Sequence, residues 1–257
     1  MKNVIVQYYL NYNNVGKQKN HYPMEGMPEW VKVSSECMKR YAEKVGADYF
    51  FFTDRQVNSK SNYFEVTRFY KDPMFDEYDK LLYCDVDVLP KNMDSNIFEE
   101  VDLVDVAGWC ETRMQPICVP INWSASQGLH NRFNHFGSRL VESSRNRGQI
   151  RMLNSGVLLW SKQARLKARE GFIDHEEWFH YNNALLDTSL PSSVGHSSHC
   201  LDQPFLNAMF TKLNFNVNEI DMKWNRFPCH DENYPCNFAH YVQDYRFNIP
   251  KIAEGIK

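Results

Sequence analysis

The first third of the chain alternates between strand-like and helix-like hydrophobic patterns, and this alternation limits the possible folds more than any other feature. Residues 4–10, 47–54 and 81–89 are mostly apolar runs of strand length. Residues 29–45 and 63–70 place apolar side chains at helical spacings between them. Strands separated by helices favour a mostly parallel sheet with helices on both faces and ligands beyond the carboxyl ends of the strands. We therefore expect an α/β fold in a single domain.

The rest of the chain continues this pattern less regularly. A polar stretch rich in Asn, Arg and Ser predicts long loops, and strand and helix signals follow it. The tail from Phe227 onward is expected to be irregular. The expected elements are loops over 109–150, a strand over 152–160, and helices over 162–169, 175–186 and 204–213.

The composition excludes several classes of protein. A formal net charge of −3 with no long basic tract argues against a nucleic-acid-binding surface. No apolar stretch approaches the roughly 20 residues of a membrane span, and the opening residues lack the apolar region of a secretory signal, so we expect neither feature. The seven cysteines are scattered without a CxxC pair, which indicates reduced thiols and a cytoplasmic location. A GxGxxG dinucleotide fingerprint is also absent from the sequence.

The segment LLYCDVDVLP, residues 81–90, places two carboxylates in an otherwise apolar run. If the run is one strand, Asp85 and Asp87 point to the same side and repel each other. A divalent cation between them would remove this repulsion. Mg²⁺ and Mn²⁺ suit such a pair because both take carboxylate oxygens and keep other positions for water and substrate phosphates.

Four segments together resemble the ordered motifs of GT-A glycosyltransferases, which have a Rossmann-like central sheet flanked by helices. The resemblance is greatest to glycosyltransferase family eight, which includes glycogenin and bacterial lipopolysaccharide galactosyltransferases. Any one of the segments is a modest signal, whereas four in the right order are fairly specific. They are YCDVDVLP (83–90), MLNSGVLLW (152–160), LDQPFLN (201–207) and NFAHY (237–241).

The resemblance implies a role for each matching residue. In the family, both aspartates of the DxD motif and a late histidine bind Mn²⁺, and the first aspartate also contacts the donor. The implied metal ligands are Asp85, Asp87 and His240, with Mn²⁺ or Mg²⁺ as the ion. The implied donor-binding residues are Tyr8 and Tyr12 for the nucleobase, Arg68 for the phosphates, Asp85, and Asn154, Ser155 and Gly156 for the sugar. The implied catalytic residues are Asp202 and Gln203, near the reacting carbon.

Simpler interpretations exist for several of these residues. Asp202 precedes Pro204 and an apolar helix, which is typical of a helix N-cap. His240 could be an ordinary half-buried histidine. The chain also departs from the family, because His240 is not followed by the family's glycine and diphosphate-binding lysine. Whether Lys251 replaces that lysine stays open, and the early segment lacks the family's usual acidic residue for uridine.

The resemblance implies a metal-dependent glycosyltransferase of the hexosyltransferase type. It would move a sugar from a nucleoside-diphosphate sugar to a glycan or glycoconjugate hydroxyl, with retention of configuration. A UDP-sugar is favoured as the donor, with a GDP-sugar as the alternative. Residues 1–257 would form one GT-A domain, with a nucleotide-binding half over 1–108 and a sugar- and acceptor-binding half over 109–257.

Two other functions fit part of the sequence. A phosphatase of the haloacid dehalogenase type would use Asp85 as nucleophile, since apolar residues followed by DxD also match that motif. However, that motif normally ends the first strand, and here 84 residues precede it. A non-catalytic nucleotide- or carbohydrate-binding domain is the second alternative.

Overall fold

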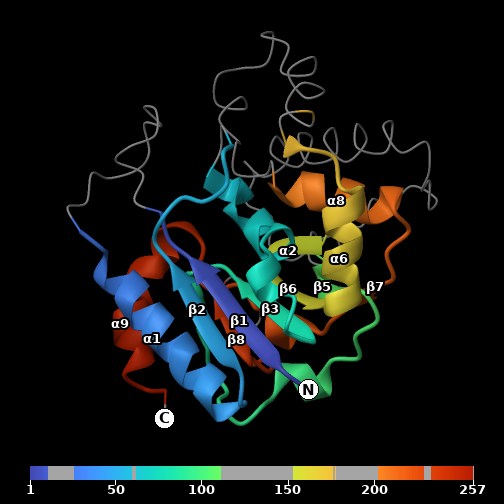
Figure 1. Ribbon diagram of the computed structural model, residues 1–257. Helices are drawn as coiled ribbons and strands as arrows, with labels where there is room; N and C mark the ends of the chain where they lie inside the picture. Colours follow the sequence, from blue (N-terminus) through green and yellow to red (C-terminus); the bar gives the residue numbers. More distant parts are fainter. Residues whose placement is uncertain are drawn as a thin grey trace, which may run out of the picture.

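The computed structural model describes residues 1–10, 26–59, 62–110, 153–175, 177, 202–228 and 233–256. In this part of the chain, a large and a small sheet are surrounded by helices (Figure 1). The strands are β1 (Asn3–Tyr8), β2 (Asp48–Phe52), β3 (Lys80–Cys84), β4 (Val88–Pro90), β5 (Val106–Cys110), β6 (Leu153–Ser161), β7 (Val217–Glu219) and β8 (Phe238–His240). The α-helices are α1 (Glu29–Lys44), α2 (Arg68–Lys71), α3 (Ile97–Glu100), α6 (Lys162–Gly171), α8 (Asp202–Lys212) and α9 (Ile249–Ala253). The 3₁₀ helices are η2 (Asn62–Thr67), η3 (Pro73–Phe75), η6 (Met222–Trp224) and η7 (Gln243–Asn248).

The large sheet has six strands in the order β2-β1-β3-β6-β5-β7. Strand β1 pairs in parallel with β2 and β3, and β5 pairs in parallel with β7. Strand β6 is antiparallel to both of its neighbours, β3 and β5. Three of the five pairings are therefore parallel, and the expected mostly parallel central sheet is confirmed. Because β6 comes from the second half of the chain and lies between strands of the first half, one sheet serves both halves.

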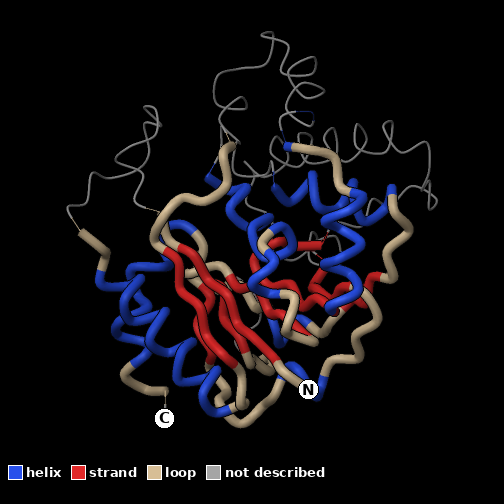
Figure 2. Tube along the Cα trace, viewed as in Figure 1, coloured by secondary structure: helices blue, strands red, loops and turns tan. Residues whose placement is uncertain are grey.

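Both faces of the large sheet are covered, as expected for an α/β fold (Figure 2). Along β1, Val4 and Val6 join the core beneath α2, α6 and α8, whereas Ile5 joins the core beneath α1 and α9. This alternation is the two-residue period of a strand that is buried on both sides. In the described part of the chain, no helix combines the length and the apolar character that crossing a membrane requires.

Two sequence predictions are wrong. Residues 81–89 do not form one strand, because β3 ends at Cys84 and a turn over 85–87 leads into β4 of the small sheet. The backbone N–H of Val88 donates to the Asp85 carbonyl at 3.0 Å, which closes this turn. The tail after Phe227 is not irregular, since it contains β8, η7 and α9. With three residues, β8 is too short to show a two-residue period, and its partner β4 lies far away in the sequence.

Two other predictions cannot be assessed. The helix expected over 175–186 falls almost entirely outside the described residues. The loops expected over 109–150 do so as well, apart from residues 109 and 110, which belong to β5.

Candidate active site

The small sheet brings Asp85, Asp87 and His240 together, and these three residues are called the triad below. Strand β4 pairs with β8 in antiparallel register, with Val88 opposite His240. The His240 Nε2 atom consequently lies 3.2 Å from Asp87 Oδ1 and 3.6 Å from Asp85 Oδ2. One ligand atom from each triad residue lies within 4.8 Å of the other two. A pairing between segments about 150 residues apart therefore assembles the cluster.

Three hydrogen bonds hold Asp85 at the end of β3. Its backbone N–H donates to the Gly156 carbonyl at 2.8 Å. The buried Gln7 side chain donates from Nε2 to the Asp85 carbonyl at 3.0 Å, and the Tyr83 hydroxyl donates to Asp85 Oδ1 at 2.6 Å. The carboxylate position is thus fixed from β1, β3 and β6 together.

The triad is acidic and largely buried. The side chain of His240 is 4% exposed, that of Asp87 13% and that of Asp85 36%. Burial, with a further contribution from Asp87, raises the pKa of Asp85. For Asp87, burial is outweighed by His240 and Arg246, which lower its pKa. Two carboxylates and one imidazole in mutual reach fit Mn²⁺ or Mg²⁺, because such ions prefer oxygen ligands and imidazole suits first-row metals.

The absence of a side chain at Gly156 leaves room for two triad residues, His240 and Asp85. A Cβ atom at this position would lie 2.3 Å from His240 Cε1 and 2.9 Å from Asp85 Oδ2. Both distances are shorter than real Cβ contacts, so a side chain here would displace a triad residue. The family resemblance implies donor-sugar binding at Gly156, and the structure shows that this glycine also allows the close approach of the triad residues.

The expected sugar-binding residues Asn154 and Ser155 and the expected catalytic residue Gln203 lie beside the triad. Gln203 Oε1 accepts hydrogen bonds from the backbone N–H of Ser155 at 3.0 Å, from Asn154 Nδ2 at 3.3 Å and from Ser155 Oγ at 3.4 Å. With its oxygen occupied, Gln203 has only the N–H groups of Nε2 to offer a ligand. The structure therefore brings together β6 and the start of α8, as the ordered motifs predicted.

Asp202 opens α8 and is 7% exposed. Burial raises the pKa of Asp202 to about 7, and the nearby Asp85 charge acts in the same direction. A carboxyl group with this pKa can carry a proton at neutral pH. Asp202 is the first residue of α8, one position after an N-cap, and the Asp85 charge acts on its pKa. A position at the helix start and a role in the site are therefore compatible.

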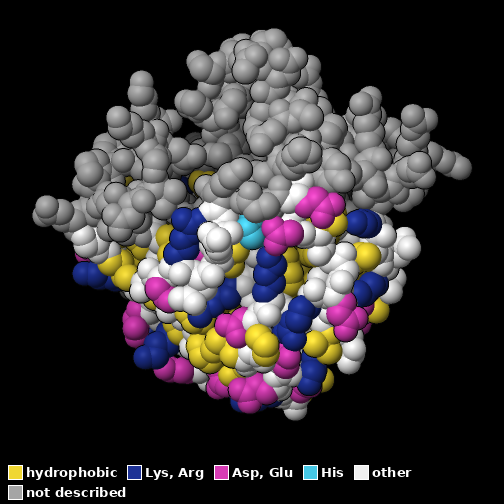
Figure 3. All heavy atoms as spheres, turned by 45° about the horizontal axis from the view of Figure 1, so that its top comes forward, with side chains coloured by type: hydrophobic (Ala, Val, Ile, Leu, Met, Phe, Trp, Pro, Cys, Tyr) yellow, Lys and Arg dark blue, Asp and Glu magenta, His cyan; other side chains and the backbone are white. Residues whose placement is uncertain are grey.

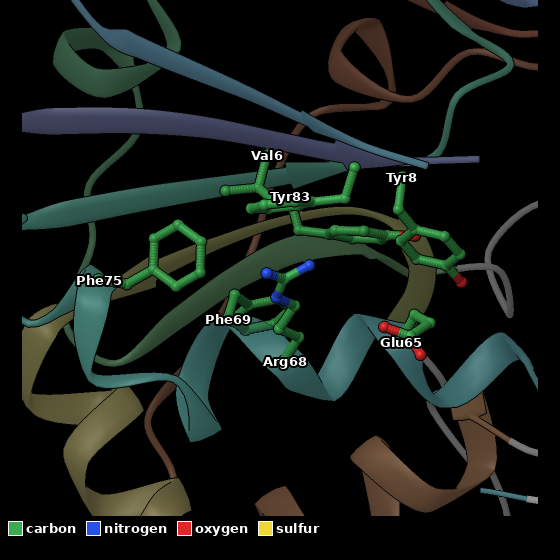
Figure 4. Close-up of a pocket in the computed structure, with 8 residues that line it drawn as sticks. Val6, Tyr8, Glu65, Arg68, Phe69, Phe75 and Tyr83 are labelled. Atoms are coloured by element: carbon green, nitrogen blue, oxygen red, sulfur yellow. The ribbon is translucent and has the colours of Figure 1, made fainter. Parts of the chain in front are cut away.

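The structure places Arg68 and Tyr8 in a different environment. Both line a small pocket with apolar walls, together with Val6, Phe52, Glu65, Phe69, Phe75 and Tyr83 (Figure 4). The Arg68 guanidinium lies 3.7 Å above the centre of the Phe52 ring, and its Nε atom lies 3.6 Å from Asp72 Oδ2. Tyr8 stacks on Tyr83 with ring centres 5.9 Å apart. Tyr83 in turn donates its hydroxyl hydrogen to Asp85, so this pocket adjoins the triad. Tyr12 lies outside the described residues.

Arg246 on η7 is a site residue that the sequence analysis missed. Its Nη2 atom lies 3.6 Å from Asp87 Oδ2, and its guanidinium lies 5.2 Å from the centre of the Trp30 ring. Lys251, the basic residue considered instead, is exposed on α9. The signal was present but easily overlooked, because Arg246 follows His240 by six residues. The sequence does not show that η7 turns this side chain back towards Asp87.

Comparison with known proteins identifies the family. Residues 27–245 match Glycosyl transferase family 8 over most of the chain. The chain belongs to this family. The expected resemblance and the expected enzyme class, a glycosyltransferase of the hexosyltransferase type, are thereby confirmed. No curated protein sequence matches the chain.

Solved structures agree on the fold of this family 8 glycosyltransferase. A glycosyltransferase involved in the glycosylation of the major capsid of PBCV-1 matches with a TM-score of 0.52 and 13% identity, covering 98% of this chain and 99% of the other. The galactosyltransferase LgtC, in complex with donor and acceptor sugar analogues, matches with a TM-score of 0.50 and 13% identity, covering 99% and 96%. These likenesses confirm the GT-A fold.

Replacing Gly156 by Ala should weaken metal binding. The new Cβ must displace His240 or Asp85, so we expect the affinity for Mn²⁺ to fall roughly 10- to 100-fold in a calorimetric titration. Gly255→Ala is the matched control, because its Cβ would meet only the Ile252 carbonyl at 3.7 Å. Equal Mn²⁺ affinity in wild type and Gly156→Ala would show that the triad does not bind an ion as one unit.

Asp202 should make the stability of the metal-free protein depend on pH. Its folded-state pKa of about 7 exceeds the ordinary value of about 3.9, so the folded protein binds the proton more tightly. The free energy of unfolding should therefore fall as pH rises from about 4 to about 7. The pKa difference corresponds to roughly 4 kcal/mol.

The Asp202→Asn variant tests this dependence, because the amide keeps the size of the side chain and does not titrate. Urea unfolding across this pH range should show a smaller loss of stability in the variant than in wild type. Asp244→Asn, at an exposed position on η7, should keep the wild-type profile. Parallel profiles for Asp202→Asn and wild type would contradict the assignment.

Proposed function

We propose that this glycosyltransferase moves a sugar from a nucleoside-diphosphate sugar to a hydroxyl of a glycan or glycoconjugate acceptor. A UDP-sugar is favoured as the donor over a GDP-sugar. The observation that carries the proposal is the close association of the triad with Asn154 and Gln203. Groups suited to a cation and groups suited to sugar hydroxyls share one site, which is the arrangement that a charged diphosphate joined to a sugar requires.

The triad residues Asp85, Asp87 and His240 would hold Mn²⁺ or Mg²⁺. When bound, the ion would offset the negative charge that develops on the diphosphate leaving group. The chain prepares this position in advance, since Tyr83 and Gln7 fix Asp85 and the β4–β8 pairing fixes His240. Such advance ordering lowers the reorganisation that the reaction needs.

Arg246 is proposed to contact the diphosphate. Its guanidinium lies beside Asp87 and over the Trp30 ring, so its position is defined by two neighbours. Arginine presents several N–H donors in a planar array that matches phosphate oxygens. This assignment replaces Lys251, while Arg68 remains a prediction for a phosphate contact.

Gln203 and Asp202 are proposed to lie against the donor sugar. Gln203 would donate from Nε2 to the sugar or to the breaking bond, because its oxygen is already engaged. Asp202 would present a carboxyl group whose protonation changes near neutral pH. Retention of the anomeric configuration is part of the proposal and is supported by membership of family 8.

The two proposed halves of the domain meet at this site. Asp85 and Asp87 come from the nucleotide-binding half over 1–108, whereas Asn154, Asp202 and His240 come from the sugar- and acceptor-binding half over 109–257. Both signs of charge are interspersed over the described surface in Figure 3, which fits a small-molecule donor better than a large charged polymer. The cytoplasmic location stays a prediction.

A panel of UDP- and GDP-sugars tests the proposed function. Titration calorimetry with and without Mn²⁺ should show one preferred donor whose binding requires the ion. Asp87→Ala should abolish this Mn²⁺-dependent binding, because it removes one of two carboxylates from the triad. Asp244→Ala is the control, since this residue also carries a carboxylate but lies exposed on η7.

The products formed from the preferred donor distinguish the proposed transferase from the phosphatase and from the binding domain. Transfer with retention to a simple sugar acceptor, followed by NMR of the product, would support the proposal in full, and an inverted linkage would remove the retaining mechanism. Phosphate release that survives Asp87→Ala but is lost in Asp85→Asn would favour the phosphatase. Tight donor binding without transfer or hydrolysis would indicate a binding domain.

Replacing Arg246 by Ala should raise the KM for the donor. A hydrogen bond to a charged group contributes about 1.5–3 kcal/mol, so we expect a rise of roughly tenfold to a hundredfold. Lys251→Ala should leave the KM near the wild-type value, because this lysine lies exposed on α9. If Arg246→Ala changes only the affinity for Mn²⁺, then Arg246 positions the Asp87 carboxylate and does not contact the donor.

A further inference from the structure

A chain of buried side chains runs from His240 to Gln203. His240 Nδ1 lies 2.9 Å from Asn225 Oδ1, and Asn225 Nδ2 donates to Asn154 Oδ1 at 2.8 Å. Asn154 Nδ2 donates in turn to Gln203 Oε1 at 3.3 Å. All four side chains belong to residues that are at most 7% exposed, and Asn225 is 0% exposed. Asn225 therefore connects the triad with the proposed sugar-binding residues.

Two backbone N–H groups determine the orientation of every amide in this chain. The Gly156 N–H donates to Asn154 at 2.9 Å, and the Ser155 N–H donates to Gln203 at 3.0 Å. A backbone N–H can only donate, so the atom that it contacts must be the amide oxygen. Asn154 thus turns its oxygen towards both Gly156 and Asn225. Asn225 must then present its NH₂ group to Asn154 and its oxygen to His240.

This orientation decides the protonation of one nitrogen of His240. The nitrogen that faces an amide oxygen must carry a hydrogen, because that oxygen can only accept. Nδ1 of His240 is consequently protonated, and Nε2 is the nitrogen that can give up its proton to present a lone pair. Nε2 is the atom that lies 3.2 Å from Asp87 and 3.6 Å from Asp85. The nitrogen that can become a metal ligand therefore lies on the side of the triad where a cation would bind.

We propose that Asn225 is the positioning residue of this site and that it keeps Nδ1 of His240 protonated. The same amide fixes Asn154, so one side chain sets both a triad ligand and a sugar-binding residue. Phe227 supports the arrangement by stacking on the His240 ring, with centres 4.8 Å apart. The consequence for metal binding rests on the proposed function, whereas the protonation of Nδ1 is a property of the metal-free chain.

The protonation of Nδ1 can be measured directly. In metal-free protein with ¹⁵N-labelled histidine, long-range ¹H–¹⁵N NMR above the usual titration range of histidine distinguishes the two nitrogens. The His240 signals are assigned by their loss in His240→Gln. We expect a protonated Nδ1 in wild type. A wild-type spectrum with an unprotonated Nδ1 would overturn the proposal without any variant.

Two substitutions separate the two hydrogen bonds of Asn225. Asn225→Asp keeps an acceptor for His240 and should keep Nδ1 protonated. Asn225→Leu removes both bonds, so the signals should no longer show a single Nδ1–H form, and the affinity for Mn²⁺ should fall roughly 10- to 100-fold. If the leucine variant does not fold, the wild-type and aspartate spectra still decide the protonation of Nδ1.

Asn237→Leu is the matched control. Asn237 is also a buried asparagine, 4% exposed and three residues before His240, but its side chain accepts a hydrogen bond from Asn92. It should leave the protonation of His240 Nδ1 unchanged. An unchanged protonation of Nδ1 in Asn225→Leu would overturn the proposal even if the enzyme transfers sugar. A changed protonation of Nδ1 without donor binding would instead count against the proposed function alone.

Discussion

Two carboxylates that face each other in a largely buried turn are the constraint around which the site is built. Like charges at this distance repel, and burial makes their charged forms more costly. Neighbouring groups stabilise the two carboxylates: His240 and Arg246 lie next to Asp87, and the Tyr83 hydroxyl donates a hydrogen bond to Asp85. These partners reduce the repulsion between the carboxylates. An arrangement that holds acidic groups together in this way favours the binding of a cation.

The sequence predicted the elements of this fold better than it predicted their connections. Strands β1, β3 and β6 could be predicted because each is a mostly buried apolar run, and β2 because it is an aromatic run that is partly buried. The β4–β8 pairing was not visible, because both strands have three residues and lie about 150 positions apart. Periodicity reports local geometry, whereas a pairing of this kind depends on the whole chain. The DxD segment was consequently interpreted as one strand, although the aspartates occupy a turn.

The same difference between local patterns and long-range contacts applies to the candidate site. The motifs around Asp85, Asn154, Asp202 and His240 could be predicted to lie together, since each carries a residue pattern that the family resemblance orders along the chain. Asn225 and Arg246 could not, because nothing in their neighbouring residues distinguishes them from other polar side chains. Their importance lies in contacts with residues 15 and 71 positions away for Asn225, and 159 positions away for Arg246. Such roles exist only in three dimensions.

The geometry also favours Arg246 over Arg68 as the proposed contact for the diphosphate. Arg68 is held over Phe52 in a pocket with apolar walls, on the face of the sheet covered by α2, α6 and α8. Arg246 lies next to Asp87, where the charge of a bound diphosphate would be concentrated. A cation acts most strongly on a developing charge when it is close and already in place. Arg246 meets this condition in the present arrangement of side chains, whereas Arg68 would have to leave its pocket.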